Sequence, residues 1–402
     1  MPLAVYILGL GIFTQGTSEF MLSGLLPGMA RDLGVSIPDT GLLISAFAVG
    51  MVVGAPLLAV LTLRWPRRTA LVVLQGVFIA AHVVGALAPG YAVLFATRVV
   101  SAFAYAGFWG VAVATAVAMV PEDAKAKAVA VVAGGLTLAT IVGVPAGTVL
   151  SQFAGWRAAF WAVAAATVVS LLCALFAVPG RQEAAEETRS VRAELRGMAR
   201  PRLWLSYAIT ACAFGAVIVT FSYLASVLTE VSRIPEGWVP AVLALFGAGG
   251  LVGVTIGGRT AEKYPLRTLG WGLGGLAAGS VLLALTARSA GVTVALVFFL
   301  GLTGYVTNPA LQSRVFALAP DAPTLVGATN TAAFNVGNTL APMLGGLVID
   351  AGFGFAAVAW VGAALGTAGV AGVLWAGRLQ HRTRPAAVAA PGAAGLPART
   401  GR

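Results

Sequence analysis

Residues 53–69 read VGAPLLAVLTLRWPRRT, and residues 252–268 read VGVTIGGRTAEKYPLRT. Both stretches are apolar runs that end in a basic turn, and they align without a gap, so that Pro66 matches Pro265. Glycines and basic turns also recur by chance in membrane proteins, but the shared register favours duplication. We therefore interpret the chain as two copies of one unit in the same orientation, an arrangement typical of alternating-access transporters.

Long apolar runs follow one another on both sides of this repeat. The 402 residues are 59% hydrophobic and 10% charged, which excludes a water-soluble globule. Each run approaches the roughly 20 residues that a helix needs to cross a bilayer, and helices satisfy their own backbone groups there. We predict an all-α membrane protein with twelve transmembrane helices in two pseudo-symmetric six-helix bundles. The predicted spans are 3–26, 39–62, 69–88, 91–119, 126–151, 158–178, 203–228, 238–260, 267–288, 291–314, 323–348 and 354–377.

The basic residues indicate how the chain lies in the membrane. With a cytoplasmic N-terminus, the even-numbered connections and the C-terminal tail face the cytoplasm, and they hold twenty of the 25 Lys and Arg residues. The outward connections hold four, and Arg98 lies inside a span. Because Lys and Arg concentrate on the cytoplasmic side of membrane proteins, we predict a multi-pass protein with both termini in the cytoplasm.

The spans and the polar segments between them divide the chain. We predict an N-terminal six-helix bundle at residues 1–178, a cytoplasmic linker at 179–202 and a C-terminal six-helix bundle at 203–377. Residues 378–402 are rich in Arg, Pro and Ala and have few large apolar side chains, which favours a disordered basic cytoplasmic tail.

Several kinds of function are disfavoured by the residues present. The net charge of +11 comes from membrane loops rather than from a basic soluble face with aromatic residues, so we expect no nucleic-acid partner. His82 has no second ligand at metal spacing, and an uncharged packing role is favoured for it. The sequence contains no nucleophile–base set and no phosphate loop. We therefore predict a protein that is not an enzyme and uses no metal or cofactor.

Glu19 is the one acidic residue of the fourteen that is embedded in a predicted span, since the other thirteen lie in loops or at helix ends. An embedded ionisable group costs about 2.5–3.5 kcal/mol on insertion scales, which makes it a functional candidate. Arg98 is its basic counterpart, since both lie roughly 10 Å below the outer surface at 1.5 Å per residue. Equal depth permits an ion pair or a shared water cavity. The structural alternatives are a passive hydrogen-bonded carboxyl and an arginine that only caps backbone carbonyls.

Polar and aromatic residues follow helical spacing on several spans, and such stripes favour a cavity over lipid. Hydrogen bonds that merely join helices, worth about 0.6–2 kcal/mol each, explain any single Asn equally well. Aromatic residues in spans more often serve packing. The candidates for a substrate cavity are Gln15, Tyr105, Phe108, Tyr305, Asn308, Gln312, Asn335 and Asn338.

Two motifs resemble those of the major facilitator superfamily, and within it the twelve-helix drug:proton antiporters. Residues 94–107, LFATRVVSAFAYAG, are similar to a family motif around an embedded arginine, which implies a proton-coupling role for Arg98. Residues 134–150, GGLTLATIVGVPAGTVL, resemble the antiporter signature, which implies a tight helix interface that limits proton leak. The signature residues are Gly135, Gly143, Pro145 and Gly147.

The basic turn LRWPRRT, residues 63–69, resembles the family's signature between the second and third helices but departs from it. Leu63 stands where the family has Asp, and Pro66 stands where it has Gly. The acid is kept only in the second half, as Glu262. We therefore expect an anchoring role rather than a charge relay for Arg64, Arg67 and Arg68.

The opening residues 6–36, YILGLGIFTQGTSEFMLSGLLPGMARDLGVS, and residues 155–163, GWRAAFWAV, resemble actinobacterial chloramphenicol-resistance exporters. The resemblance covers residues 1–378. It implies proton-coupled efflux of a small neutral amphiphilic drug, chloramphenicol above all, by a monomer in the bacterial cell membrane. Two alternatives stay open: an exporter of a sugar or other metabolite with the same fold, and a membrane sensor or scaffold that transports nothing.

Overall fold

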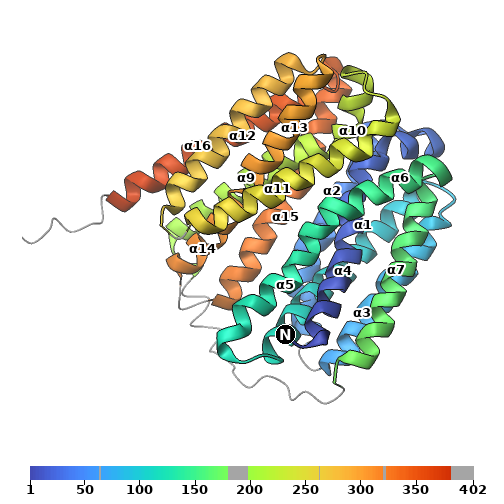
Figure 1. The fold of residues 1–402 in the computed structure, drawn as a ribbon, viewed down its shortest axis with the longest axis vertical. Helices are drawn as coiled ribbons and strands as arrows, with labels where there is room; N and C mark the ends of the chain where they lie inside the picture. Colours follow the sequence, from blue (N-terminus) through green and yellow to red (C-terminus); the bar gives the residue numbers. More distant parts are fainter. Residues whose placement is uncertain (63–64, 180–197, 262, 320–322, 382–402) are drawn as a thin grey trace, which may run out of the picture.

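The computed structural model describes residues 1–62, 65–179, 198–261, 263–319 and 323–381. Within these residues the regular structure is helical throughout. Figure 1 shows two groups of helices side by side, with the first half of the chain on the right and the second half on the left. This arrangement confirms the predicted all-α fold of two helical bundles.

The first bundle is built from the helical elements of the first half of the chain. Their bounds are α1 (Leu3–Leu33), α2 (Ile37–Thr62), α3 (Arg67–Ala86), α4 (Tyr91–Ala118), η1 (Glu122–Ala124), α5 (Lys125–Leu138), η2 (Ala139–Gly143), α6 (Val144–Ala154) and α7 (Trp156–Ala177). Those of the second bundle are α9 (Pro201–Ser222), α10 (Leu224–Ser226), η3 (Val227–Val231), η4 (Glu236–Trp238), α11 (Val239–Ala261), α12 (Pro265–Thr286), α13 (Ala290–Tyr305), α14 (Asn308–Leu318), α15 (Pro323–Val348), η5 (Ile349–Phe353) and α16 (Ala357–His381).

Helix packing in the second bundle repeats that in the first. α3 packs against α4 and α7, and α12 packs against α13 and α16 in the same way. Likewise α2 packs on α4, and α11 packs on α13. The two bundles meet chiefly where α2 lies on α15 and where α11 lies on α6 and η2. The duplication read from the basic turns therefore appears in the fold as two similarly packed units.

Eleven segments of the described chain are long and apolar enough to cross a membrane. They correspond to the second to twelfth predicted spans. α1 is 31 residues long but is not among them, because its middle is polar. Thr14, Gln15, Thr17, Ser18 and Glu19 are all buried there. Burial inside the protein, rather than exposure to lipid, is what makes this polar helix tolerable.

Two predicted spans are interrupted by prolines. The span predicted at 291–314 is divided between α13 and α14, because Pro309 has no N–H to donate to the carbonyl of Tyr305. In the span predicted at 126–151, Pro145 follows the π-helical turn η2. A proline that removes an interior hydrogen bond commonly accompanies such a turn.

Several predictions fall partly outside the described residues. Most of the predicted linker, the tail beyond His381 and Arg64 lie there, and the domain boundaries stay predictions.

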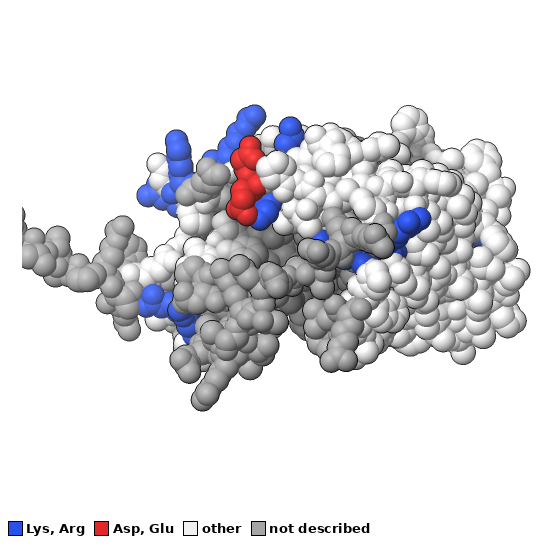
Figure 2. Space-filling model, turned by 90° about the horizontal axis from the view of Figure 1, so that it is seen from below, with Lys and Arg blue, Asp and Glu red and all other residues white. Residues whose placement is uncertain are grey.

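Figure 2 views the molecule from below and shows Lys and Arg side chains toward the left and centre, whereas the right-hand part of this face is almost free of charge. An uncharged face of this kind is typical of contact with lipid.

Candidate functional site

Glu19 lies near the middle of α1 and is 6% exposed. Its Oε1 accepts a hydrogen bond of 3.1 Å from Nδ2 of Asn338, which lies on α15 and is 1% exposed. Because α1 and α15 belong to different bundles, this bond joins the two halves of the molecule. The structure thus brings together two residues that the sequence assigned separately, one to proton coupling and one to the substrate cavity.

The second amide atom of Asn338 makes this pair sensitive to protonation. Oδ1 of Asn338 is buried and has no hydrogen-bond partner among the described residues. A neutral carboxylic acid has an O–H that can donate to an amide oxygen, whereas a carboxylate only accepts. An amide can therefore form two hydrogen bonds with protonated Glu19 but only one with the charged form.

Arg98 on α4 is fully buried and contacts the residue before Glu19. Its Nη1 donates to Oγ of Ser18 at 2.8 Å, and its Nη2 donates to the Ser18 carbonyl at 3.0 Å. Its guanidinium carbon lies 4.2 Å from the centroid of the Phe47 ring. Within the described chain Glu19 and Arg98 form no ion pair, which was one of the two arrangements that equal depth permits.

His82 on α3 belongs to the same site, although sequence reasoning assigned it to packing. Its Nε2 lies 2.6 Å from Oγ of Ser18, and its Nδ1 lies 2.9 Å from the carbonyl of Phe78. Counting residues from the outer end of each predicted span, as for Glu19 and Arg98, places His82 at a similar depth. Six residues separate His82 from the outer end of its predicted span, against seven for Glu19.

The cavity candidates of the first bundle pack around α1. Tyr105 and Phe108 on α4 are buried, and a side chain at Gly11 would collide with the Phe108 ring at 2.5 Å. Tyr105 also lies 6.0 Å from Phe47, between ring centroids. Gln15 is fully buried one helical turn before Glu19, and neither of its amide atoms has a hydrogen-bond partner in the described chain.

The cavity candidates of the second bundle differ in how far their side chains are buried. Tyr305 is half-buried, and its ring centroid lies 6.1 Å from that of Phe246. Asn335 donates to the Thr331 carbonyl within its own helix. Asn308 is half-buried and Gln312 is exposed. Asn338 is therefore the member of this group that the structure places on Glu19.

The glycines of the antiporter signature face α1. A side chain at Gly135 would collide with the backbone carbonyl of Gly9, and one at Gly143 would collide with Thr17. At Gly147 the nearest atom would be Cβ of Met21, at 3.4 Å. α5, η2 and α6 therefore approach α1 closely at these glycines.

The basic turn anchors helix ends within the first bundle. Nη2 of Arg68 donates to the Leu175 carbonyl at 2.5 Å, and Nη1 of Arg67 lies 3.4 Å from the Ala114 carbonyl. In the second bundle Arg314 is also buried, and its Nε donates to Oγ of Ser206 at 3.0 Å. Sequence reasoning counted Arg314 as a loop residue, because it ended a predicted span.

Residues 6–36 and 155–163, which carry the resemblance to the chloramphenicol-resistance exporters, meet at one end of the molecule. We call this the loop end because it carries the connection from α1 to α2. Nε1 of Trp156 donates to Oδ2 of Asp32 at 2.8 Å, and the Arg157 guanidinium pairs with the same oxygen. These two hydrogen bonds lower the pKa of Asp32 below its ordinary value.

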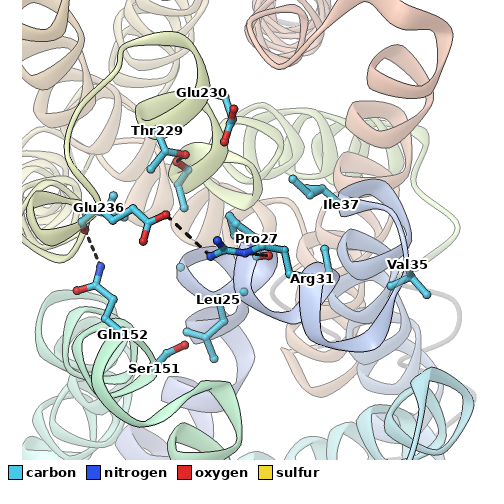
Figure 3. Close-up of a pocket in the computed structure, with 15 residues that line it drawn as sticks. Leu25, Pro27, Arg31, Val35, Ile37, Ser151, Gln152, Thr229, Glu230 and Glu236 are labelled. Carbon is cyan, nitrogen blue, oxygen red and sulfur yellow. Dashed lines mark hydrogen bonds and ion pairs between the residues drawn. The ribbon is translucent and has the colours of Figure 1, made fainter.

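A pocket of about 470 Å³ opens between the bundles at the loop end (Figure 3). Arg31 from the first bundle and Glu236 from the second form an ion pair of 3.9 Å across it, and Nε2 of Gln152 donates to the Glu236 carbonyl at 2.6 Å. Gly24 and Leu25 of α1 also line it. The cavity residues predicted from the sequence do not line this pocket, which lies beyond Glu19 along α1.

Comparisons with known proteins agree with this architecture. The model of the Major Facilitator Superfamily matches residues 8–332 and 237–400. A chloramphenicol resistance protein of Streptomyces lividans is 42% identical over 86% of this chain and 88% of its own length. The inner membrane transport protein YdhP of Escherichia coli K12 is 36% identical over 94% of this chain and 96% of its own length.

Solved structures show the same fold at lower identity. The inward-facing, unoccupied structure of a bacterial homolog of the human lysosomal transporter Spinster matches 96% of this chain and 98% of its own, with a TM-score of 0.80 at 18% identity. Because the family model matches most of the chain, and full-length relatives exceed 30% identity, the chain belongs to the Major Facilitator Superfamily and is a membrane transporter rather than an enzyme.

Proposed function

We propose that this transporter exports a small neutral amphiphilic drug, chloramphenicol above all, in exchange for protons that bind Glu19. The observation that carries the proposal is the hydrogen bond between Glu19 and Asn338, which places a buried carboxyl on the contact between the two bundles. A group in this position can link its protonation to their relative movement, because one bundle holds the proton and the other holds its partner.

The choice of substrate is supported by the Streptomyces lividans chloramphenicol resistance protein, which is 42% identical over 86% of the chain. Glu19 is the single acidic residue buried in the described helices. A neutral drug needs no second charge for its recognition. The unpartnered amide of Gln15 provides a donor and an acceptor for a polar, uncharged ligand one turn from Glu19.

A transport cycle follows from the number of hydrogen bonds that Asn338 forms with Glu19, two with the protonated acid and one with the carboxylate. The bundles touch at the loop end through the Arg31–Glu236 pair. Deeper in the molecule, Oγ of Ser45 on α2 donates to the Thr339 carbonyl on α15 at 2.8 Å. With the loop end outward, this state is closed to the outside. Protonated Glu19 ties the bundles with two hydrogen bonds and favours this state. Loss of the proton to the cytoplasm weakens the tie, and the drug-loaded protein then opens outward.

The first experiment measures accumulation of radiolabelled chloramphenicol in cells that express the protein, with and without a proton-gradient collapser. We expect lower accumulation on expression and its reversal by the collapser. Unchanged drug accumulation would rule out the antibiotic as substrate, and parallel assays with sugars would then test the metabolite exporter. If neither chloramphenicol nor any sugar responds, both substrate classes are refuted.

Glu19→Gln tests the proton role. Gln keeps the side-chain volume and can hydrogen bond Asn338, but it cannot take up or release a proton. We expect this variant to reach the membrane at wild-type levels and to lose gradient-driven export. The matched control is Glu122→Gln, because Glu122 is exposed and pairs with Lys125 at a helix end. Full resistance in the Glu19 variant would refute the proton role.

A further inference from the structure

The described structure holds a chain of buried hydrogen bonds whose donors and acceptors can be assigned for a neutral His82 imidazole. The Phe78 carbonyl only accepts, so the Nδ1 of His82 that faces it carries the proton. Nε2 of a neutral imidazole is then an acceptor, and the Ser18 hydroxyl must donate to it across 2.6 Å. The Ser18 oxygen in turn accepts from Nη1 of Arg98.

Aromatic rings fix both ends of this chain. The His82 ring stacks on Phe78 with centroids 4.1 Å apart, and it lies 5.6 Å from Phe160. At the other end the Arg98 guanidinium covers the Phe47 ring. His82 is 1% exposed, and both Ser18 and Arg98 are 0% exposed. All three groups are therefore shielded from water.

This series of hydrogen bonds keeps Arg98 from contacting Glu19. Two of its nitrogens are occupied by the hydroxyl and the carbonyl of Ser18, and Ser18 immediately precedes Glu19. If Ser18 lost its bond to His82, its hydroxyl could rotate and Arg98 could leave it for the neighbouring carboxyl. A carboxylate is the stronger partner of a guanidinium. An ion pair with Arg98 would hold Glu19 in its charged form, away from Asn338.

We propose that His82 is a positioning residue for proton coupling: as a neutral imidazole protonated at Nδ1, it orients Ser18, and through Ser18 it keeps Arg98 off Glu19. This inference rests on the proposed role of Glu19. It differs from that role because it assigns to His82 no uptake or release of protons. His82 is required as a hydrogen-bond acceptor of fixed geometry.

A matched pair of substitutions separates the two sides of the imidazole. In His82→Gln the amide reaches the position of Nε2 and keeps an acceptor for Ser18. In His82→Asn the amide reaches only the position of Nδ1 and keeps the bond to Phe78. In proteoliposomes we expect His82→Asn and Ser18→Ala to lose about tenfold of pH-gradient-driven chloramphenicol transport, the effect of one buried hydrogen bond. Downhill flux should persist in both, and His82→Gln should keep both activities.

Nitrogen-15 NMR of histidine-labelled protein tests the same proposal without any substrate. The chain has two histidines, so His381→Asn leaves only the His82 signals. We expect a neutral ring protonated at Nδ1, with an Nε2 signal that moves in Ser18→Ala. A charged ring, or one protonated at Nε2, overturns the proposal, as does equal behaviour of the Gln and Asn variants. If the wild type moves no chloramphenicol, the proposed function fails, and the NMR result alone decides on His82.

Discussion

At the scale of single residues, the bond between Asn338 and Glu19 joins two buried side chains from different bundles. Asn330, on the same helix as Asn338, provides a comparison. Its Oδ1 accepts from Oγ1 of Thr210 at 3.2 Å, entirely within the second bundle. Both bonds contribute to folding, but only the first changes when the bundles move apart.

Asn338→Leu should therefore lower export by each folded molecule, by about fivefold for the loss of roughly 1 kcal/mol from one hydrogen bond. Asn330→Leu should lower thermal stability by a similar energy while leaving export by each folded molecule unchanged. The measurement is gradient-driven efflux divided by the amount of monodisperse protein recovered from the same membranes. Equal losses in the two variants would mean that the bond to Glu19 has no special part in transport.

At the scale of elements, hydropathy and the positions of proline explain what could be predicted. The apolar runs predicted the eleven segments of the described chain that are long and apolar enough to cross a membrane, because a bilayer fixes the length of a span and favours a helical backbone. The break between α13 and α14 follows from Pro309, which lies inside the span predicted as unbroken at 291–314. Contacts between side chains of different helices were harder to predict from the sequence. Depth related Glu19 to Arg98, but only packing shows that Ser18 lies between His82 and Arg98. Rotation of a helix about its axis depends on neighbours that hydropathy does not record.

The contact between α5 and α1 gives a prediction at this scale. A methyl group at Gly135 would meet backbone atoms, the Gly9 carbonyl and the Phe13 nitrogen. Backbone cannot rotate away, so Gly135→Ala should destabilise the protein by about 1–3 kcal/mol. At the adjacent Gly134 a methyl group would meet nothing within 4 Å, so Gly134→Ala should be neutral or gain up to ~1 kcal/mol from helix propensity. Thermal melting of the two purified variants checks the difference, and equal melting temperatures would show that α5 does not press on α1.

At the scale of the whole molecule, alternating access requires the loop end to open during each cycle, and this can be prevented by one covalent bond. A Cβ at Gly346 on α15 would lie 3.3 Å from Cβ of Pro38 on α2, close to the roughly 3.5–4.5 Å of a disulfide. With Cys173 and Cys212, both free, replaced by Ala, the double variant Pro38→Cys, Gly346→Cys should cross-link under mild oxidation. Transport should stop and return when a thiol reductant is added, while each single cysteine variant should not respond to the oxidant. Undiminished flux through fully cross-linked protein would mean that the loop end stays closed throughout transport, which no rocking movement of the two bundles permits.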